Sequence, residues 1–258
     1  MKLNQQKTVN ELIGFIKSEL ANTGMKKAVI GLSGGIDSAV SAYLTAKAIG
    51  SENLLGILMP YKTSSESSIT DALSVVNILG IRHKIFEITG MADAYIEKLD
   101  GSVSGLRKGN VMARCRMIVL FDHSAAENAI VIGTGNKTEA LLGYTTLYGD
   151  SACGINPVGD LYKTQLREIA KYLNVPESII TKNPSADLWE GQTDEGEMGI
   201  TYELVDKYLF ARFEENKTED ELLKSGFEDS FIKRVNGLII KNEFKRKHPP
   251  IAIVQGKF

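Results

Sequence analysis

A short apolar run that stops at a turn of glycine and serine constrains this chain more than any other stretch. Residues 28–31 read Ala-Val-Ile-Gly, the turn contains Ser33-Gly34-Gly35, and an alanine-rich helical pattern begins at Ala39. A strand, a glycine turn and a helix in this order direct backbone N–H groups and a helix N-terminus toward one point, which favours bound phosphate. The stretch therefore predicts a phosphate-binding loop.

Asp37 is the unusual member of this turn. A carboxylate beside phosphates repels them unless a cation lies between, so Asp37 is predicted to bind magnesium. Ser33 and Ser38 would add hydroxyl donors to the phosphates. The structural alternative is a tight turn in which Asp37 or Ser38 caps the following helix.

Alternating strand and helix patterns predict an α/β fold with a doubly wound, mainly parallel sheet and helices on both faces. Beyond the first strand, the patterns predict helices over 4–21, 39–49, 66–79 and from Asn110, and strands over 53–59, 83–88 and 129–133. Ligands bind such sheets at the carboxyl ends of the strands, where the strand order reverses, so the 33–38 loop is expected there. No linker or repeat divides the chain, and one domain over 1–258 is expected.

Composition limits the partners. The 30 Lys and Arg residues are balanced by 32 Asp and Glu residues, which excludes a generally basic surface that coats nucleic acid. The chain has no apolar run of about twenty residues, so no membrane span is expected. Its two cysteines, Cys115 and Cys153, form no metal or redox motif, which suits the reducing cytoplasm. We expect a cytoplasmic protein that holds any anionic ligand locally.

A second polar turn follows the strand over 129–133 and ends at Glu139, with Asn136 or Thr138 available to cap the next helix. Glu139 alone would be an ordinary acidic residue in a helical first turn. Together with Asp37 it offers a second carboxylate from a neighbouring strand end. Magnesium between phosphates is often held by one or two carboxylates, so Glu139 is a second candidate ligand.

Lys163 begins a helix predicted over 163–173, with Asp160 as its expected N-cap. A cation in a helical first turn opposes the dipole preference for acids, which favours a phosphate partner over a solvated lysine. The preceding residues, 143–163, are irregular, and long irregular stretches inside a domain are usually functional.

Two further loops allow two interpretations each. The 60–66 loop is either a helix cap supplied by Ser64 or Ser65, or a flap over the nucleotide. The segment 183–196 around Trp189, the only tryptophan, is either a surface loop or a lid that excludes water.

Two helical regions suggest further contacts. The helix from Asn110 is apolar on more than one face, which predicts a homodimer, and its Arg114 and Arg116 need a counter-anion. The helical tail ends in a basic cluster that includes Lys245, which would complement a helix C-terminus or bind an anion.

These motifs resemble a known family. Ser33-Gly34-Gly35-Ile36-Asp37-Ser38 is similar to the pyrophosphate loop of the ATP pyrophosphatase superfamily, whose members adenylate a substrate and release pyrophosphate. Residues 113–117 (Ala-Arg-Cys-Arg-Met), 133–139 (Gly-Thr-Gly-Asn-Lys-Thr-Glu) and 184–188 (Pro-Ser-Ala-Asp-Leu) narrow the resemblance to ammonia-dependent NAD synthetases over nearly the whole chain.

The resemblance implies an activity: ATP- and Mg²⁺-dependent amidation of nicotinic acid adenine dinucleotide (deamido-NAD) by ammonia, through an acyl-adenylate, to NAD, AMP and pyrophosphate. It implies magnesium ligands at Asp37 and Glu139 and substrate contacts at Arg114 and Lys245. It further implies ATP contacts at Gly31, Leu32, Ser33, Gly34, Gly35, Ile36, Asp37, Ser38, Thr134, Lys163 and Ser185. Asp37 and Lys163 would act in catalysis, and Asp187 is the candidate that receives a proton from ammonium.

The chain departs from some relatives at three positions. A lysine, an aspartate and a histidine stand in those relatives at the positions of Leu147, Gly154 and Phe244, so these substrate contacts need replacements such as Asp150 or Lys245. Many relatives carry a fused glutaminase domain. This chain is too short for one, and neither cysteine has a nucleophile setting, so free ammonia is the expected nitrogen source.

Two rival functions share the 33–38 loop. Another adenylating enzyme of the superfamily, tRNA-modifying or GMP-forming, should bring a basic RNA-facing surface or catalytic cysteines. An ATP-binding sensor that does not turn ATP over should lack the second metal ligand. The presence of Glu139 and Lys163 disfavours this alternative.

Overall fold

A four-stranded parallel sheet forms the centre of the molecule in the computed structural model, which describes residues 3–183, 185, 196 and 199–253. The strand order is β3-β2-β1-β4, and Ala28 of β1 lies in register with Leu54 on one side and Ile130 on the other. The strands are β1 (Lys27–Gly31), β2 (Leu54–Leu58), β3 (Arg82–Ile85) and β4 (Ala129–Ile132). The strand order reverses between β1 and β4, so the predicted doubly wound sheet is confirmed.

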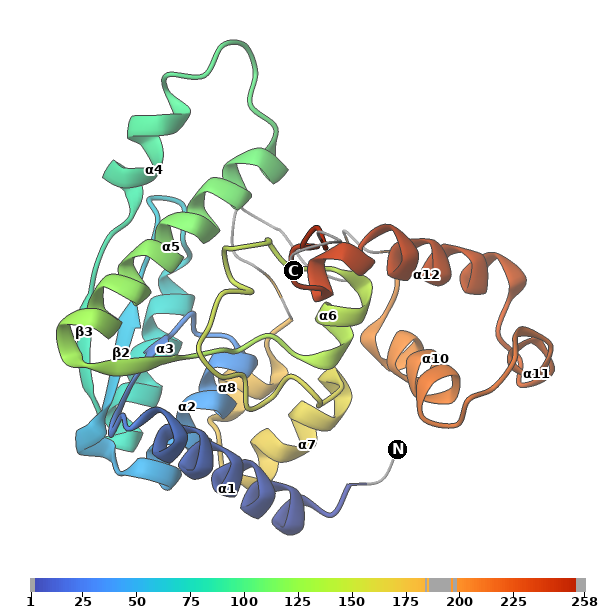
Figure 1. Ribbon diagram of the computed structural model, residues 1–258, viewed down its shortest axis with the longest axis horizontal. Coiled ribbons are helices and arrows are strands. Elements are labelled where there is room, and N and C mark those ends of the chain that lie inside the picture. Colours follow the sequence, from blue (N-terminus) through green and yellow to red (C-terminus); the bar gives the residue numbers. More distant parts are fainter. Residues whose placement is uncertain (1–2, 184, 186–195, 197–198, 254–258) are drawn as a thin grey trace, which may run out of the picture.

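Helices cover both faces of the sheet, because successive strand residues point to opposite sides. Ala28 and Ile30 pack in one apolar cluster, whereas Val29 between them packs in another. The first cluster is closed by α1 (Gln5–Thr23), α2 (Ile36–Ile49), α3 (Glu66–Leu79), α7 (Lys163–Tyr172) and α8 (Glu177–Thr181). The second is closed by α4 (Thr89–Ile96) and α5 (Gly105–Glu127), which crosses the sheet in Figure 1. Burial on both faces explains why β1, β2 and β4 are almost entirely apolar, whereas the edge strand β3, which reads Arg-His-Lys-Ile, is exposed.

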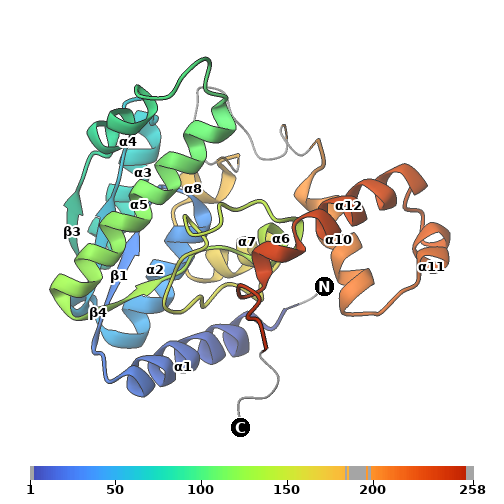
Figure 2. The same cartoon turned by 45° about the horizontal axis from the view of Figure 1, so that its top comes forward.

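The C-terminal helices form a lobe beside the sheet, clearest in Figure 2. They are α10 (Tyr202–Phe213), α11 (Glu219–Lys224), α12 (Asp229–Lys241) and the short 3₁₀ turn η2 (Glu243–Arg246); a second turn, η1 (Ser51–Asn53), precedes β2. The lobe has its own apolar cluster, in which the Tyr208 ring meets Phe227 and Phe231 edge-on. This cluster includes Leu142 of α6 (Lys137–Leu142), so the lobe is attached beside the end of β4.

Two predicted helix starts and one predicted N-cap are wrong, whereas the predicted start of α7 at Lys163 is confirmed. α2 begins at Ile36 with Gly35 as N-cap, three residues before the alanine-rich pattern. α5 begins at Gly105 after its cap Ser104, earlier than the predicted start at Asn110; its first turn holds a single large apolar residue, Leu106, so no apolar period marks it in the sequence. Tyr162, not Asp160, is the N-cap of α7. The Asp160 carboxylate instead accepts from Lys137 Nζ at 2.7 Å.

The remaining expected elements agree within a few residues, and Ser65 and Asn136 cap α3 and α6 as predicted. Within the part of the chain that the structure describes, no helix is long and apolar enough to cross a bilayer.

Candidate active site

A cavity of about 510 Å³ opens at the carboxyl ends of β1, β2 and β4, which is the size range of small-ligand sites. Most of the predicted site residues line it: Gly31, Leu32, Ser33, Gly35, Ile36, Asp37, Ser38, Thr134, Glu139, Lys163, Ser185 and Lys245. Gly34 and Arg114 are not among these lining residues. Asp187 and Trp189 lie outside the residues that the structure describes.

The 33–38 loop is held by its own hydroxyl groups. Ser38 Oγ donates to the Gly35 carbonyl at 3.0 Å and accepts from the Ser33 N–H at 3.3 Å, while the Gly35 N–H donates to Ser33 Oγ at 3.2 Å. The cap residue Gly35 has no side chain, so the alternative in which Asp37 or Ser38 is merely the N-cap of α2 is wrong. The loop sets the start of α2 at the cavity wall, where a helix N-terminus attracts anions.

Gly34 is required by the packing of this loop on α3. Its φ of +78° lies in the left-handed region, and a Cβ atom there would stand 2.2 Å from the carbonyl oxygen of Ser68. Only glycine therefore lets the loop approach the first turn of α3.

Lys163 joins the two strand-end loops inside the cavity. Its Nζ lies 2.5 Å from Asp37 Oδ2 and 3.2 Å from Glu139 Oε1. The Lys163 side chain is 2% exposed, whereas each carboxylate side chain is 18% exposed. The expected alternative of a solvated lysine is therefore wrong, and a buried cation is available at the cavity wall.

Asn136 links the same loops a second time. Its Nδ2 donates to Asp37 Oδ1 at 2.7 Å, while its Oδ1 accepts from the Glu139 N–H at 3.0 Å and thereby caps α6. The Glu139 carboxylate in turn accepts from the Asn136 N–H at 3.2 Å, completing a capping box. The carboxylates of Asp37 and Glu139 are thus held side by side although 102 residues separate them in the chain (139 minus 37).

This pair of carboxylates fits magnesium. Among the described residues, no group of three or more His, Cys, Asp or Glu side chains could hold a metal ion. Magnesium beside a nucleotide needs only one or two carboxylates, because phosphate oxygens and water complete its shell. Asp37 and Glu139 both reach one ammonium group, so both can reach one cation.

The basic residues Arg114, Arg116 and Lys245, for which the sequence predicted an anionic partner, donate hydrogen bonds to backbone carbonyls. Arg114 Nη2 donates to the Leu147 carbonyl at 3.2 Å, and Arg116 Nε donates to that of Met59 at 3.1 Å. Lys245 Nζ donates to the carbonyls of Gly143 at 2.7 Å and Thr145 at 2.8 Å. Burial lowers the pKa of the Lys245 amine from its ordinary value.

The C-terminal cations also complement a helix end. Arg246 Nη1 donates to the carbonyls of Ala140 and Leu141, near the C-terminus of α6. From the sequence, this basic cluster could either pair with the carbonyls of a helix C-terminus or bind an anion. For Arg246 the structure shows the pairing with helix carbonyls.

Gly154 cannot be replaced by a larger residue in this packing. A Cβ atom there would lie 2.4 Å from Cγ1 of Ile130, a core residue of β4. The nearby Asp150 carboxylate lines the cavity and accepts from Thr145 Oγ1 at 2.8 Å and the Thr146 N–H at 2.7 Å.

The 60–66 loop is tied to α4 as well as to α3. Tyr61 Oη donates to Asp93 Oδ1 at 2.6 Å, and Lys62 Nζ donates to Asp93 Oδ2 at 2.5 Å. These two bonds, that of Lys62 first, hold the pKa of Asp93 below its ordinary value. The helix-cap interpretation is confirmed for Ser65, and the flap over the nucleotide stays a prediction.

A second ion-paired lysine on the cavity wall escaped the sequence reasoning. Lys182 follows α8, and its Nζ donates to Asp71 Oδ2 at 3.0 Å and Ser68 Oγ at 3.2 Å. The available indication was Asp71 itself, a carboxylate on the buried face of a helix beside Ala72 and Val75.

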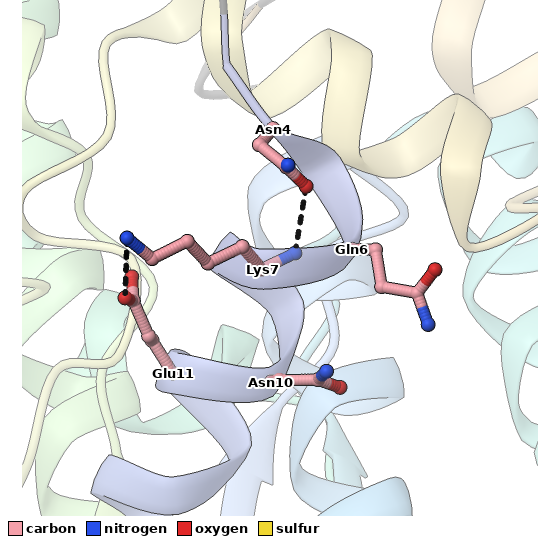
Figure 3. Close-up of a pocket in the computed structure, with 5 residues that line it drawn as sticks. All are labelled: Asn4, Gln6, Lys7, Asn10 and Glu11. Atoms are coloured by element: carbon pink, nitrogen blue, oxygen red, sulfur yellow. Dashed lines mark hydrogen bonds and ion pairs between the residues drawn. The ribbon is translucent and has the colours of Figure 1, made fainter.

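A second hollow, on the surface of α1, has no comparable chemistry. Figure 3 shows that Asn4 and the first turns of α1 alone line it. Asn4 caps the helix through the Lys7 N–H, and Lys7 Nζ lies 3.8 Å from Glu11 Oε1 on an exposed face. The cavity at the strand ends is therefore the candidate active site.

The family model described as NAD synthase matches residues 8–249 of the chain. This chain belongs to the NAD synthase family. The resemblance found in the motifs is thereby confirmed. Curated members from Fusobacterium nucleatum and Wolinella succinogenes, both named NH(3)-dependent NAD(+) synthetase, are 49% and 48% identical to it. These alignments cover 99% and 98% of this chain and 98% of each relative.

Solved structures of family members have the same fold. The NH3-dependent NAD synthetase from Campylobacter jejuni, in complex with the nitrate ion, aligns with a TM-score of 0.83 and 38% identity over 98% of this chain and all of its own. A protein described as NMN synthetase, from Francisella tularensis, aligns with a TM-score of 0.86 and 34% identity over 99% of this chain and all of its own. The glutamine-dependent NAD+ synthetase from Acinetobacter baumannii, in complex with ADP, matches at a TM-score of 0.70 and 29% identity; the match covers 98% of this chain but only 47% of that protein.

Proposed function

We propose that this protein catalyses the ATP-dependent amidation of deamido-NAD by ammonia, giving NAD, AMP and pyrophosphate. The observation that carries the proposal is Lys163, a buried cation between Asp37 and Glu139, beside a glycine-rich loop that ends in a helix N-terminus. The family relatives named NH(3)-dependent NAD(+) synthetase, 46 to 49% identical, support the same reaction.

ATP is the proposed occupant of the 33–38 loop. Backbone N–H groups at the start of α2 and the Ser33 and Ser38 hydroxyls would hold its phosphates, with further contacts from Thr134 and Ser185. The Acinetobacter baumannii family member, solved with ADP, supports an adenine nucleotide. Asp37 and Glu139 would hold Mg²⁺, which supplies positive charge against the phosphates when bound.

The chemistry proceeds in two displacements. The nicotinate carboxylate attacks the α-phosphorus of ATP, forming a C–O–P acyl-adenylate and breaking the bond to pyrophosphate, whose added charge Lys163 stabilises. Ammonia then attacks the acyl carbon, AMP leaves, and one proton is released. We propose that Asp187, which lies outside the described residues, accepts the proton that ammonium gives up when it becomes the attacking ammonia.

Further residues are proposed to bind the dinucleotide substrate and to exclude water from the cavity. Arg114 and Lys245 are the proposed contacts for the anionic dinucleotide. Asp150, which lines the cavity, is the proposed replacement for the lysine and aspartate that some relatives carry at the positions of Leu147 and Gly154. Water would hydrolyse the acyl-adenylate, so the 60–66 loop, which lines the cavity through Pro60 and Ser64, would restrict its entry.

We further propose that α5 mediates a homodimer in the cytoplasm. Leu106, Ile118 and Phe121 are 71%, 52% and 40% exposed on this helix, which is costly for large apolar groups in water. A sedimenting mass of one chain at micromolar concentration would contradict the dimer.

One assay tests the function. The purified protein is given ATP, Mg²⁺, ammonium and deamido-NAD, and NAD, AMP and pyrophosphate are quantified against samples that lack one component each. Equal amounts of the three products, all dependent on ammonium, are expected. A parallel sample with nicotinic acid mononucleotide tests the activity that the name of the Francisella tularensis relative suggests. No NAD, whatever ATP is hydrolysed, would contradict the proposal.

A further inference from the structure

Asp206 is a buried carboxylate in the C-terminal lobe, and the site described above gives it no role. It is 0% exposed and lies on the apolar face of α10 between Tyr202 and Leu209, which are also fully buried. Burial raises the pKa of its carboxyl group, while hydrogen bonds from Thr138 and Thr164 oppose the rise. A carboxylate is an expensive residue at such a position unless donors satisfy it.

Its two oxygen atoms bind the first turns of two different helices. Thr138 Oγ1, in α6, donates to Asp206 Oδ1 at 2.5 Å, and the Thr164 N–H, in α7, donates to Asp206 Oδ2 at 2.7 Å. Thr138 Oγ1 in addition accepts from the Lys163 N–H at 3.0 Å. One carboxylate therefore holds together the N-terminal turns of α6 and α7.

These are the turns that carry the charged groups of the cavity. Glu139 follows Thr138 in α6, and Lys163 precedes Thr164 in α7. The distance between Glu139 Oε1 and Lys163 Nζ, 3.2 Å, thus depends on how α6 and α7 are joined beneath it. Asp206 and Thr138 form that joint.

Other residues of the lobe contact the same two turns. Lys163 Nζ lies 5.2 Å from the centre of the Tyr202 ring, at the start of α10. At its other end, Glu214 accepts from Lys137 Nζ at 2.6 Å and from Tyr162 Oη at 3.0 Å. The lobe therefore grips α6 and α7 along the length of α10, with Asp206 near the middle.

We propose that Asp206 is a positioning residue, which acts through Thr138 and the first turn of α7 to hold Lys163 opposite Glu139. The inference rests on the proposed function for its kinetic consequence, and on the structure alone for the ordering of the α7 turn. Asp206 does not line the cavity, so it acts on substrate only through Lys163.

The variants remove one member of the joint at a time. Asp206→Asn keeps the size of the side chain but replaces an acceptor oxygen by a donor. Thr138→Val removes the hydroxyl group at constant shape, and Thr138→Ser restores it. Thr45→Val is the matched control, because Thr45 is 0% exposed, its hydroxyl donates to the Ser41 carbonyl at 2.7 Å, and it belongs to α2.

Kinetics measure the positioning effect. Asp206→Asn and Thr138→Val are expected to lower kcat on the order of 10²-fold with an unchanged KM for deamido-NAD, since small misplacement of a catalytic group has that size of effect. Thr138→Ser should retain kcat, as should Thr45→Val. The double variant that combines Asp206→Asn with Thr138→Val should lose no more kcat than the more damaged of the two single variants. Multiplied losses, or a full loss in Thr138→Ser, would overturn the proposal.

Amide hydrogen exchange of the ligand-free protein separates this inference from the proposed function. Faster exchange in the first turn of α7 is expected for Asp206→Asn and Thr138→Val, with α2 unchanged and the melting temperature of each variant recorded alongside. An unchanged α7 turn would overturn the positioning role even in a protein that makes NAD. If the variants exchange faster in the first turn of α7 but the wild-type protein makes no NAD, the positioning role is supported and the proposed reaction is rejected.

Discussion

Two lysines on the wall of the same cavity are ion-paired in different ways. Lys163 is 2% exposed between Asp37 and Glu139, both of which line the cavity themselves. Lys182 is 29% exposed and pairs with Asp71, whose side chain is 12% exposed and lies behind the cavity lining. The other Asp71 oxygen accepts from Ser178 Oγ at 3.0 Å.

The difference lies in what the carboxylates can do. Asp37 and Glu139 face the cavity from the first turns of α2 and α6, so in the proposed reaction they would exchange the ammonium group of Lys163 for Mg²⁺ when ATP binds. Asp71 is surrounded by α3 and α8, so its pairing with Lys182 is part of the packing. We therefore expect the first cluster to control turnover and the second to control stability.

The largest effect is expected from Lys163→Met, which should lower kcat by about 10³-fold because a preorganised charge opposite the leaving phosphates is lost. Lys182→Met is the matched control, since it removes the same charge from the same cavity wall. Equal losses of kcat in both variants would abolish the contrast between the clusters.

Asp37→Asn should come next, with a loss of kcat on the order of 10²-fold and a raised Mg²⁺ requirement, because an amide is a weaker ligand than a carboxylate. Asp71→Asn is the corresponding change in the other cluster and should leave the Mg²⁺ dependence unaltered. The measurement is the initial rate of pyrophosphate release against Mg²⁺ concentration. Wild-type dependence in Asp37→Asn would remove this residue from the metal site.

Gly34→Ala probes the contact between the 33–38 loop and α3. The left-handed backbone and the 2.2 Å approach to the Ser68 carbonyl predict a loss of about 1–3 kcal/mol in the free energy of unfolding. Chemical denaturation measures it, and Gly14→Ala in α1, where nothing lies within 4 Å, is the control. A variant as stable as the wild type would show that the loop packs differently.

Lys182→Met should lower the free energy of unfolding by about 1–2 kcal/mol, because Asp71 loses a charged hydrogen-bond partner that water partly replaces. Turnover should fall far less than for Lys163→Met. Thermal unfolding of the variant and the wild type at the same protein concentration measures this loss of stability. Unchanged stability together with a large loss of turnover would move Lys182 into the catalytic cluster.

The smallest effect is expected at a third cluster, at the opposite end of the sheet. Glu127 accepts from Lys27 and Arg82, and these hydrogen bonds, that of Arg82 first, lower its pKa to about 2 from 4.5. Its contribution to stability is therefore present above pH 4.5 and is lost as the pH falls toward 2. Glu127→Gln should reduce stability by less than about 1 kcal/mol at neutral pH and flatten the acid limb of the melting profile. An acid limb parallel to that of the wild type would refute this.

The convergence of Asp37, Glu139 and Lys163 could be predicted because parallel strands bring their carboxyl ends to one edge. The motifs placed two of the three directly after strands, and Lys163 was singled out because it opposes the dipole of its helix. Their functional roles, including those of Ser185 and Arg114, stay predictions, as does the single domain over 1–258.

Asp71 and Asp206 could not be found from local pattern, because each is satisfied by residues far away in the chain. Asp71 binds Lys182 across 111 residues, and Asp206 binds Thr138 across 68. The only local indication is a carboxylate within an apolar helical stripe, which identifies a buried polar group but not its partner. The N-cap of α7 was assigned wrongly to Asp160 for a related reason, since that carboxylate is paired with Lys137.

The most direct test of the proposed reaction follows the oxygen atoms of the substrate. Deamido-NAD labelled with ¹⁸O in its nicotinate carboxylate is converted with ATP, Mg²⁺ and ammonium, and the products are analysed by mass spectrometry. Attack on the α-phosphorus predicts one ¹⁸O atom in AMP, one in the amide of NAD and none in pyrophosphate. Unlabelled AMP, or labelled inorganic phosphate formed together with ADP, would contradict adenylation at the cavity that Lys163, Asp37 and Glu139 build.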